Sequence, residues 1–518
     1  MNKTLNSNLP PSLGHMAKHL DASETALPIV RNTTMRQDSR KRALKTILLI
    51  SVIGSLALLW TCKPDGSNRS LGIFHASVTT PNISCSTSNG RSTSHSGYIG
   101  LNGDTTENPK RSFFWYFEAE NNPKNAPVIL TIGGGPGTSG LMSPVSGQSP
   151  CGISAEGLTS NQNRWTEQFN LVALDHPIGA GYSYGTRVNN SRDAAIDVYD
   201  FLQKFFVLYP HLRKNKFILS GGSYGGIYVP NIATIINFEN KAISEGKGQP
   251  GAHHINLESM MLSNPLSDPI SHFRWLLHYR CVLHEIYNST TCQELYAALP
   301  ECLQSIQLAF EIPNVENRVV ATDKCFEKLN SDDTHGTVLE DIRKKCDSYP
   351  DMGDCFPQFT WMTDTFNNAS IKAELGVPDE ITFLALNKKV GEEFFSAGDL
   401  IQPHYLMFPP LLKDGIRLLH YIGADDGNCG WPGVFSSLKL LQSPFQHDFL
   451  NAEDLVWLDT QVPNTTVRSV GKGAGDFTYI LIPKAGHFVV RDQPALVKSV
   501  VEHWVQNKPF IISRQCDN

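Results

Sequence analysis

The hexapeptide Gly-Gly-Ser-Tyr-Gly-Gly at residues 221–226 constrains the fold of this chain more than any other segment. It follows the apolar run Phe217–Ser220, and an apolar run that stops at glycines is typical of a buried strand ending in a tight turn. A Gly-x-Ser-x-Gly turn lifts the serine hydroxyl above the sheet, and its glycines keep side chains out of the strained corner. Ser223 is therefore a candidate nucleophile; the alternative is a plain glycine-rich turn.

A serine nucleophile needs a base and a group that orients the base, and two later segments can supply them. Ile416–Cys429 is an apolar strand that ends in the acidic pair Asp425 and Asp426, and Phe477–His487 is a strand that runs into Gly-His. Ser, acid and His follow one another in the order that strand-turn-helix serine hydrolases use. Each group also comes at the carboxyl end of a strand, where open α/β sheets bind ligands. The three segments together predict a catalytic triad.

The rest of the chain alternates between buried strands and amphipathic helices. Val128–Ile132 and Asn170–Leu174 are continuous apolar runs, as in strands that are buried on both faces. Apolar residues recur at helical spacing between Ala194 and Phe205 and again after Pro494. This alternation predicts an α/β fold with a doubly wound, mostly parallel sheet.

Cysteines indicate an oxidising compartment and an inserted cap. Six of them crowd between Cys281 and Cys355, so residues from about 270 to 395 are predicted to form a largely helical, disulfide-stapled cap. An even number of cysteines after Cys62 allows five disulfides: Cys85, Cys151, Cys281, Cys292, Cys302, Cys325, Cys346, Cys355, Cys429 and Cys516. No Cys or His spacing suggests zinc, and neither a metal nor a cofactor is predicted.

Further blocks follow one another in a fixed order: Ser96–Tyr98, Phe113–Glu118, Gly133–Gly137, Leu174–Tyr184, Ser263–Pro269, Asp426 with Cys429 and Trp431, and Ala485–His487 with Asp492–Pro494. In this order they resemble the serine carboxypeptidases, peptidase family S10, over nearly everything after about residue 90. The resemblance implies an α/β-hydrolase fold. It also implies a serine hydrolase that works through an acyl-enzyme, with carboxypeptidase-type proteolysis as its activity.

The resemblance assigns roles to the triad by position. Ser223 is the nucleophile, His487 is the general base and then the acid, and Asp426 orients His487. Asp425 is the rival for the last role, and the alignment of the block favours Asp426.

The resemblance also assigns the oxyanion hole and the substrate contacts. The backbone N–H groups of Gly135 and Tyr224 are the expected oxyanion donors, and Gly133, Gly134 and Gly222 are the expected substrate contacts. An oxyanion donor typically stabilises the transition state by about 3 kcal/mol.

Four positions depart from the family pattern. Family members that remove C-terminal residues hold the substrate's carboxylate with a Trp and an Asn before the Gly-Gly-Pro-Gly loop, a Glu after it, and a Glu before the nucleophile. Thr131, Gly133, Gly147 and Gly222 stand at these positions here. A buried carboxylate without partners is costly, so ordinary exopeptidase specificity is in doubt. With no carboxyl group at position 222, the pH optimum is expected to be neutral and set by His487.

Three functions follow from this pattern. The first is a serine hydrolase of the carboxypeptidase type. The second is an acyltransferase or esterase whose acyl substrate has no free C-terminal carboxylate, and the third is a catalytically silent binding protein. The expected partner is a peptide or acyl-ester substrate. The 518-residue chain has a net charge of −6 with dispersed charges, which gives no support to nucleic-acid binding.

The N-terminal region predicts the compartment. Residues 1–42 are polar and end in Arg-Lys-Arg, which predicts a disordered cytosolic tail. Residues 43–61 form an apolar segment that is just long enough for a single-pass signal anchor. The catalytic domain, residues 62–518, would then be lumenal or extracellular in a type II membrane protein of the secretory pathway. The alternative is a secreted protein whose signal peptide is cleaved.

Asn-x-Ser/Thr triplets after the apolar segment predict a glycosylated surface. They begin at Asn68, Asn82, Asn189, Asn288, Asn368 and Asn464.

Overall fold

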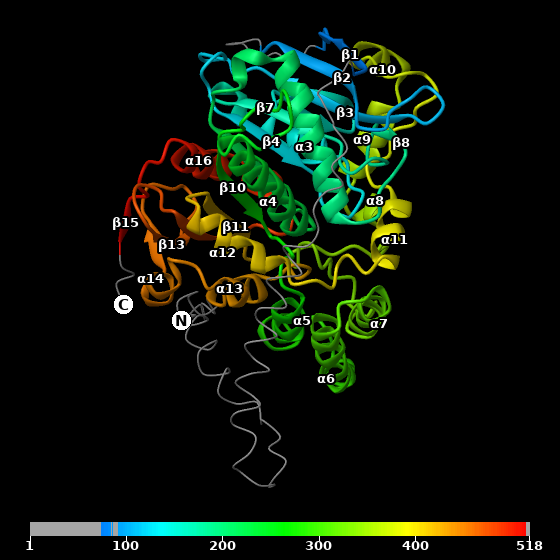
Figure 1. The fold of residues 1–518 in the computed structure, drawn as a ribbon. Coiled ribbons are helices and arrows are strands. Elements are labelled where there is room, and N and C mark those ends of the chain that lie inside the picture. The colour runs from blue at the N-terminus through cyan, green and yellow to red at the C-terminus, as the bar shows by residue number, and fades with distance from the viewer. Residues whose placement is uncertain (1–73, 84, 86–91, 514–518) are drawn as a thin grey trace, which may run out of the picture. The chain divides into compact units, whose positions relative to one another are not determined.

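The computed structural model describes residues 74–83, 85 and 92–513 (Figure 1). The predicted tail (1–42) and membrane anchor (43–61) lie outside these residues, as do Asn68, Cys62 and Cys516. Within the described residues, no helix is both long and apolar enough to cross a bilayer.

Strands from nearly the whole described chain form one large sheet (Figure 1). Its central part is parallel, in the order β7 (Asn170–Leu174), β4 (Val128–Ile132), β9 (Phe217–Gly222), β10 (Leu257–Ser263), β11 (Arg417–Gly423) and β14 (Phe477–Ile482). Antiparallel strands extend it beyond β7 with β3 (Lys110–Phe117), β2 (Ser94–Gly100) and β1 (Ala76–Thr79), and β8 (Tyr184–Gly185) pairs with β3. Antiparallel strands also extend it beyond β14 with β13 (Thr466–Val470), β12 (Leu455–Trp457) and β15 (Ile512–Ser513). A separate hairpin consists of β5 (Cys151–Ser154) and β6 (Gly157–Ser160).

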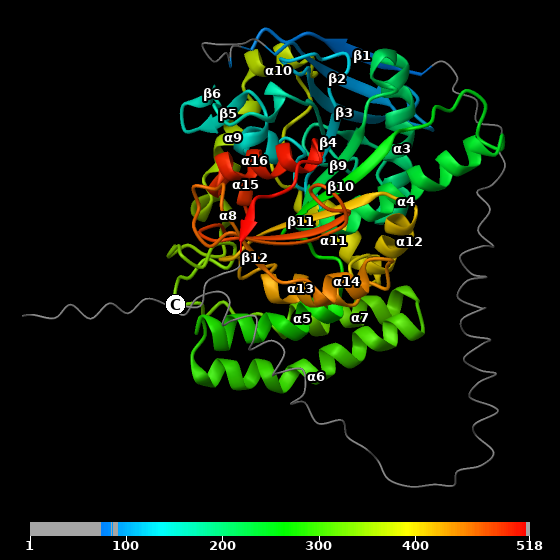
Figure 2. The ribbon, with the colours of Figure 1, turned by 90° about the vertical axis from the view of Figure 1, so that its left-hand side faces the viewer.

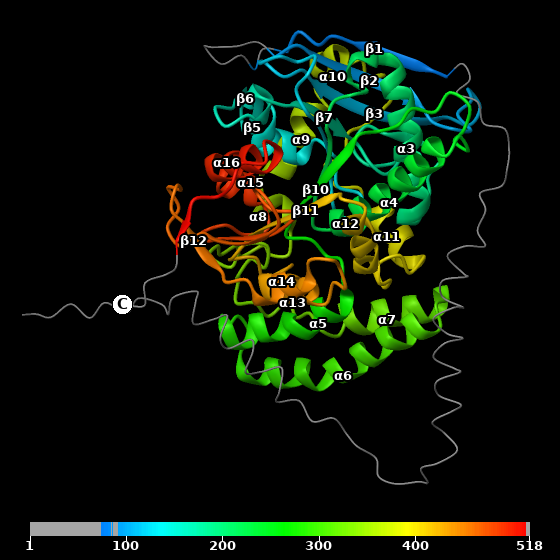
Figure 3. The same cartoon turned by 60° about the vertical axis from the view of Figure 1, so that its left-hand side comes forward.

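The parallel strands are buried on both faces. Every residue of β4, β7, β11 and β14 is buried, which requires helices on each side of the sheet. Figures 2 and 3 show α3 (Ser191–Leu208), α4 (Gly225–Ser244) and α12 (Phe408–Lys413) on one side, and α15 (Val489–Asp492) and α16 (Pro494–Val505) on the other. The predicted doubly wound α/β sheet is confirmed.

A long, largely helical insertion separates β10 from β11. Its helices are α5 (Pro269–Leu277), α6 (Ser289–Glu311), α7 (Val315–Phe326), α8 (Met352–Cys355), α9 (Gln358–Phe366), α10 (Ala369–Leu375) and α11 (Lys388–Ser396). In Figures 2 and 3, α5, α6 and α7 form a layer beside α13 (Trp431–Lys439) and α14 (Gln446–Asn451), which follow β11. Short helical turns complete the described part at Pro144–Gln148, Trp165–Glu167, Pro210–Leu212, His278–Leu283 and His404–Met407.

The predicted disulfides are present in this insertion, and the described residues contain four of the five bridges that the cysteine count allows. Three bridges lie within it: Cys281–Cys292, Cys302–Cys325 and Cys346–Cys355. A fourth, Cys85–Cys151, joins the N-terminal region to β5. Cys429 is free and buried, because it lies in the interior of the acidic turn after β11. An even count of cysteines therefore did not mean that each of them is paired.

Candidate active site

Ser223 lies in the turn between β9 and α4, and its backbone is strained. Its φ is +57°, a conformation that costs energy for a residue with a side chain. The Ser223 N–H donates to the carbonyl oxygen of Ser263 at the end of β10 (3.1 Å), and the Ser223 carbonyl accepts from the Leu266 N–H (3.0 Å). The neighbouring strand therefore holds the turn in place, and Ser223 stays partly exposed.

Asp426 is fully buried and makes a complete set of hydrogen bonds. Its Oδ2 accepts from Nδ1 of His487 (2.7 Å) and from the amide of Asn264 (2.6 Å). Its Oδ1 accepts from the backbone N–H groups of Asn428 (2.8 Å) and Cys429 (3.0 Å). Four donors thus fix the carboxylate and, through it, the plane of the His487 ring.

The surroundings of His487 favour its protonated form. Burial lowers the pKa of the imidazole, but the charge of Asp426, the hydrogen bond to Asp426 and the charge of Glu340 outweigh burial and raise the pKa overall. A general base must be neutral to accept a proton. Any activity that depends on His487 as the base is therefore expected to rise with pH and to be lost as pH falls through this raised pKa.

The side chain of Asp425 lies beside Arg343 and does not contact His487. Its Oδ2 lies 3.5 Å from Nε of Arg343, which also pairs with Asp341 and Asp492. Burial raises the pKa of Asp425, and Arg343 opposes that rise. The contact with His487 is made by Asp426 and not by its neighbour.

The same region carries potential metal ligands. Asp426, Cys429 and His487 each offer one ligand atom, and these atoms lie within 4.8 Å of one another. Both oxygens of Asp426 already accept hydrogen bonds, and burial and the nearby carboxylates raise the pKa of the Cys429 thiol. A protonated thiol is a poor ligand, so the group fits a triad better than a metal site.

The loop Gly133–Gly137 passes directly beside Ser223. A Cβ atom on Gly134 would stand 2.9 Å from Cβ of Ser223 and 3.2 Å from the backbone nitrogen of Tyr224, so only glycine permits this approach. Gly135 follows with a φ of +105°. The expected oxyanion donors, the N–H groups of Gly135 and Tyr224, therefore lie on two segments that meet at the predicted nucleophile.

At three of the four positions at which the family carries its carboxylate-binding residues, an added side chain would come very close to neighbouring backbone or side-chain atoms. A Cβ atom on Gly133 would stand 2.2 Å from the carbonyl oxygen of Thr138, and one on Gly222 would stand 2.6 Å from Oγ of Ser263. Gly147 has a φ of +154°, and its Cβ would lie 3.0 Å from Cγ1 of Val490. The missing side chains cannot be accommodated unless their neighbours move.

The predicted glycosylation sites within the described residues are all exposed: Asn82, Asn189, Asn288, Asn368 and Asn464. Two of them also cap helices, since the side chains of Asn288 and Asn368 accept from backbone N–H groups at the starts of α6 and α10. Exposure is necessary for modification, and the modification itself stays a prediction.

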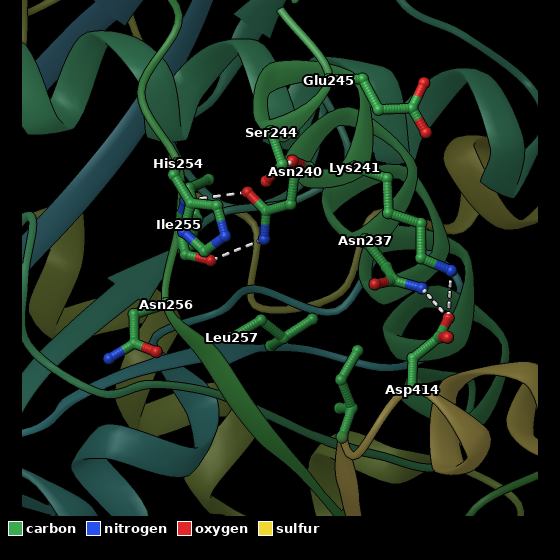
Figure 4. Close-up of a pocket in the computed structure, with 11 residues that line it drawn as sticks. Asn237, Asn240, Lys241, Ser244, Glu245, His254, Ile255, Asn256, Leu257 and Asp414 are labelled. Carbon is green, nitrogen blue, oxygen red and sulfur yellow. Dashed lines mark hydrogen bonds and ion pairs between the residues drawn. The ribbon is translucent and has the colours of Figure 1, made fainter.

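A polar cavity of about 310 Å³ lies at the opposite end of the strands (Figure 4). It is lined by the second half of α4, by Leu257 at the start of β10 and by Ile416 just before β11. Figure 4 shows Asn237 and Lys241 turned toward the carboxylate of Asp414. The predicted triad lies at the carboxyl ends of its strands, so this cavity is not its substrate site.

Two residues of the site were not assigned a role from the sequence. Asn264 has a positive φ of +40°, and its amide links Asp426 to the N–H of Gly423 (2.8 Å). Its place in the block Ser263–Pro269 was the only signal that could have revealed it. Glu340 comes from the insertion, and its carbonyl oxygen accepts from the His487 N–H (2.6 Å). It also brings a carboxyl group whose position near His487 was indicated by no sequence motif.

Comparisons with known proteins show the family of this chain. The family model described as serine carboxypeptidase matches residues 84–507. A carboxypeptidase Y homolog A from Sclerotinia sclerotiorum is 32% identical over 422 residues, which is 80% of this chain and 73% of that protein. The homolog from Neurospora crassa is 31% identical over 428 residues, covering 80% and 72%.

A crystal structure of a prohormone-processing carboxypeptidase from Saccharomyces cerevisiae shares the fold. It superposes with a TM-score of 0.68 at 21% identity and covers 80% of this chain and 92% of that one. Since the family model spans most of the sequence, the chain belongs to the serine carboxypeptidase family.

Proposed function

We propose that this chain is a serine hydrolase that forms an acyl-enzyme on Ser223. The observation that carries the proposal is the 2.7 Å hydrogen bond between Nδ1 of His487 and Oδ2 of Asp426. Asn264 links this pair to the strained turn of Ser223, because its amide donates to Asp426 and its carbonyl oxygen accepts from the Ser223 backbone N–H. Asp426 keeps the proton on Nδ1, which leaves Nε2 free to act as the base. Membership of the serine carboxypeptidase family supports a carboxypeptidase-type hydrolase.

The reaction has two halves. His487 takes the proton of Ser223 as Oγ attacks the acyl carbonyl carbon, and the protonated ring then gives that proton to the leaving group. The bond between the carbonyl carbon and the leaving group breaks, and an ester to Ser223 remains. In the second half, His487 takes a proton from water as the water oxygen attacks the ester carbon. The bond between that carbon and Oγ then breaks, the acid is released, and His487 gives the proton back to Ser223.

We assign the oxyanion hole to the N–H groups of Gly135 and Tyr224. The close approach of Gly134 to Ser223 supports this assignment, because it brings the glycine loop next to the start of α4. Donors that are already oriented in a site with little water stabilise the tetrahedral intermediate. Gly133, Gly134 and Gly222 are the proposed backbone contacts of the substrate.

One observation favours an acyl substrate that lacks a free C-terminal carboxylate. The family's carboxylate-binding positions are occupied by Thr131 and by glycines whose Cβ positions lie close to neighbouring atoms. A carboxylate that enters such a site would lose its hydration without gaining hydrogen bonds. Esters, amides or an acyl acceptor other than water suit this site better, so an esterase or acyltransferase is the favoured form of the activity.

We further propose that the catalytic domain is lumenal or extracellular. The four disulfides of the described part fit an oxidising compartment. The single-pass anchor at residues 43–61 remains a proposal from the sequence.

Matched blocked dipeptides test the choice of substrate. One dipeptide carries a free C-terminal carboxylate and the other its methyl ester or amide, and kcat/KM is compared with a Ser223→Ala blank. We expect the ester or amide to exceed the free acid by at least about tenfold, since burying a carboxylate without hydrogen-bond partners costs at least about 1.4 kcal/mol. A tenfold preference for the free acid would instead show that unidentified residues bind the carboxylate and that the enzyme is an ordinary carboxypeptidase.

A further inference from the structure

A strap of consecutive turns from the insertion is hydrogen-bonded to the loops that carry Asp426 and His487. The strap is residues 338–344, just before the Cys346–Cys355 disulfide. Its backbone hydrogen bonds run from Gly427 N–H to Leu339 O (2.7 Å), from His487 N–H to Glu340 O (2.6 Å) and from Ile342 N–H to Asp425 O (3.0 Å). The strap therefore fixes the acid loop and the histidine loop relative to each other.

The side chain of Glu340 is unusual within this strap. Its Oε2 is buried and has no hydrogen-bond partner, and the carboxyl group interacts electrostatically with His487 and Asp426. Burial raises the pKa of Glu340, whereas the charge of a protonated His487 lowers it. A buried carboxyl oxygen without a partner destabilises a fold, so its position beside the histidine calls for a functional reason.

The other charged groups nearby have partners of their own. Arg280 donates to the carbonyl oxygen of Gly427 (2.7 Å) and to Oδ1 of Asn330 (2.7 Å). Asp341 is paired with Arg343 and Lys344. Besides His487, the titratable groups that face the Glu340 carboxyl are Asp426, Cys429, Arg280 and Tyr349. Among His487 and these four groups, only His487 gains a positive charge during the proposed reaction.

We propose that Glu340 is a positioning residue of the catalytic site, whose carboxylate acts together with Asp426 to stabilise the positively charged His487 ring. The proposal rests on the function proposed above, in which the Ser223 hydroxyl proton moves to His487. Asp426 holds the ring from Nδ1, while Glu340 adds a second negative charge from the insertion. With glycine at position 222, no carboxyl group directly precedes the nucleophile, and Glu340 supplies one from a different segment.

Glu340→Gln tests this role, because it removes the charge while it keeps the size of the side chain and the backbone bond to His487. The readout is the second-order rate of Ser223 labelling by an uncharged fluorophosphonate, measured from pH 4 to 9 on the full chain. Without the Glu340 charge the His487 ring loses its proton more readily. We therefore expect the acid limb of the profile to move down by about one pH unit and the plateau rate to fall several-fold. Glu340→Asp should give a limb between those of the wild type and the Gln variant.

A matched control is Glu316→Gln, an exposed residue of α7 in the same insertion, which should leave the profile unchanged. If Glu340→Gln lowers the plateau but leaves the acid limb in place, the residue is only structural and the inference is wrong. If the Gln variant does not fold, Glu340→Asp decides in the same way. Absence of Ser223 labelling in the wild type would overturn the proposed function itself, which is a separate outcome.

Discussion

Replacing Ser223 by alanine is expected to lower kcat/KM by at least about 10⁴-fold, because removal of a triad nucleophile leaves only binding and the oxyanion donors. The Ala variant should keep its fold. The strained turn is held by backbone bonds to Ser263 and Leu266, which do not involve the hydroxyl group. The measurement is kcat/KM on the better of the two dipeptide substrates, together with the thermal unfolding temperature.

Ser244→Ala is the control for this change. Ser244 lies near the end of α4, next to the remote cavity, and its hydroxyl donates to the carbonyl oxygen of Asn240 (2.9 Å). Its replacement should leave kcat/KM within about twofold of the wild type, since it is far from the reacting groups. Comparable activity in the Ser223→Ala variant would mean that another residue performs the chemistry.

Asp426→Asn is expected to lower kcat by about 10⁴-fold, the size of effect seen when a triad acid becomes an amide. An amide donor at this position would bond to Nδ1 and force the His487 proton onto Nε2, where the base must be free. In this variant the NH₂ group at position 426 would also face the NH₂ group of Asn264, so the hydrogen bond that Asn264 donates to Asp426 would be lost. Measurement of kcat at a pH well above the acid limb separates this loss from a change in the protonation of His487.

Asp425→Asn is the matched comparison, because the two residues are adjacent and both lie in the acidic turn. Asp425 contacts Arg343 instead of His487, so kcat should fall by less than about tenfold. Equal losses in the two variants would contradict the assignment of Asp426 as the residue that orients the base.

The pairing of an acidic turn with His487 and the strained turn of Ser223 could be predicted from the sequence, because each of these segments follows a recognisable strand. The choice between Asp425 and Asp426 could not be made from the residues alone, since both follow the same strand. Burial and hydrogen bonds distinguish them: both Asp426 oxygens point inward to donors, while Asp425 reaches Arg343 of the insertion. The resemblance to the family had favoured the same residue.

The contacts that the insertion makes with the catalytic loops could not be predicted from the sequence. Glu340 is distant in sequence from both catalytic loops and belongs to no motif, so only the fold brings it to His487. The free thiol of Cys429 was missed for a similar reason, since counting cysteines carries no information about which of them face each other. The glycines at 133 and 222 were predicted to lack binding groups, but only the structure shows how closely neighbouring atoms approach them.

Trapping of the acyl-enzyme tests the central claim most directly. The full chain would be mixed with a slowly deacylating p-nitrophenyl ester, quenched in acid during turnover and digested for peptide mass spectrometry. We predict a mass increase equal to the acyl group on the peptide that contains Ser223, and none in the Ser223→Ala variant. Turnover of the ester with no adduct, or with an adduct on a different residue, would contradict the proposal that this chain acts through Ser223.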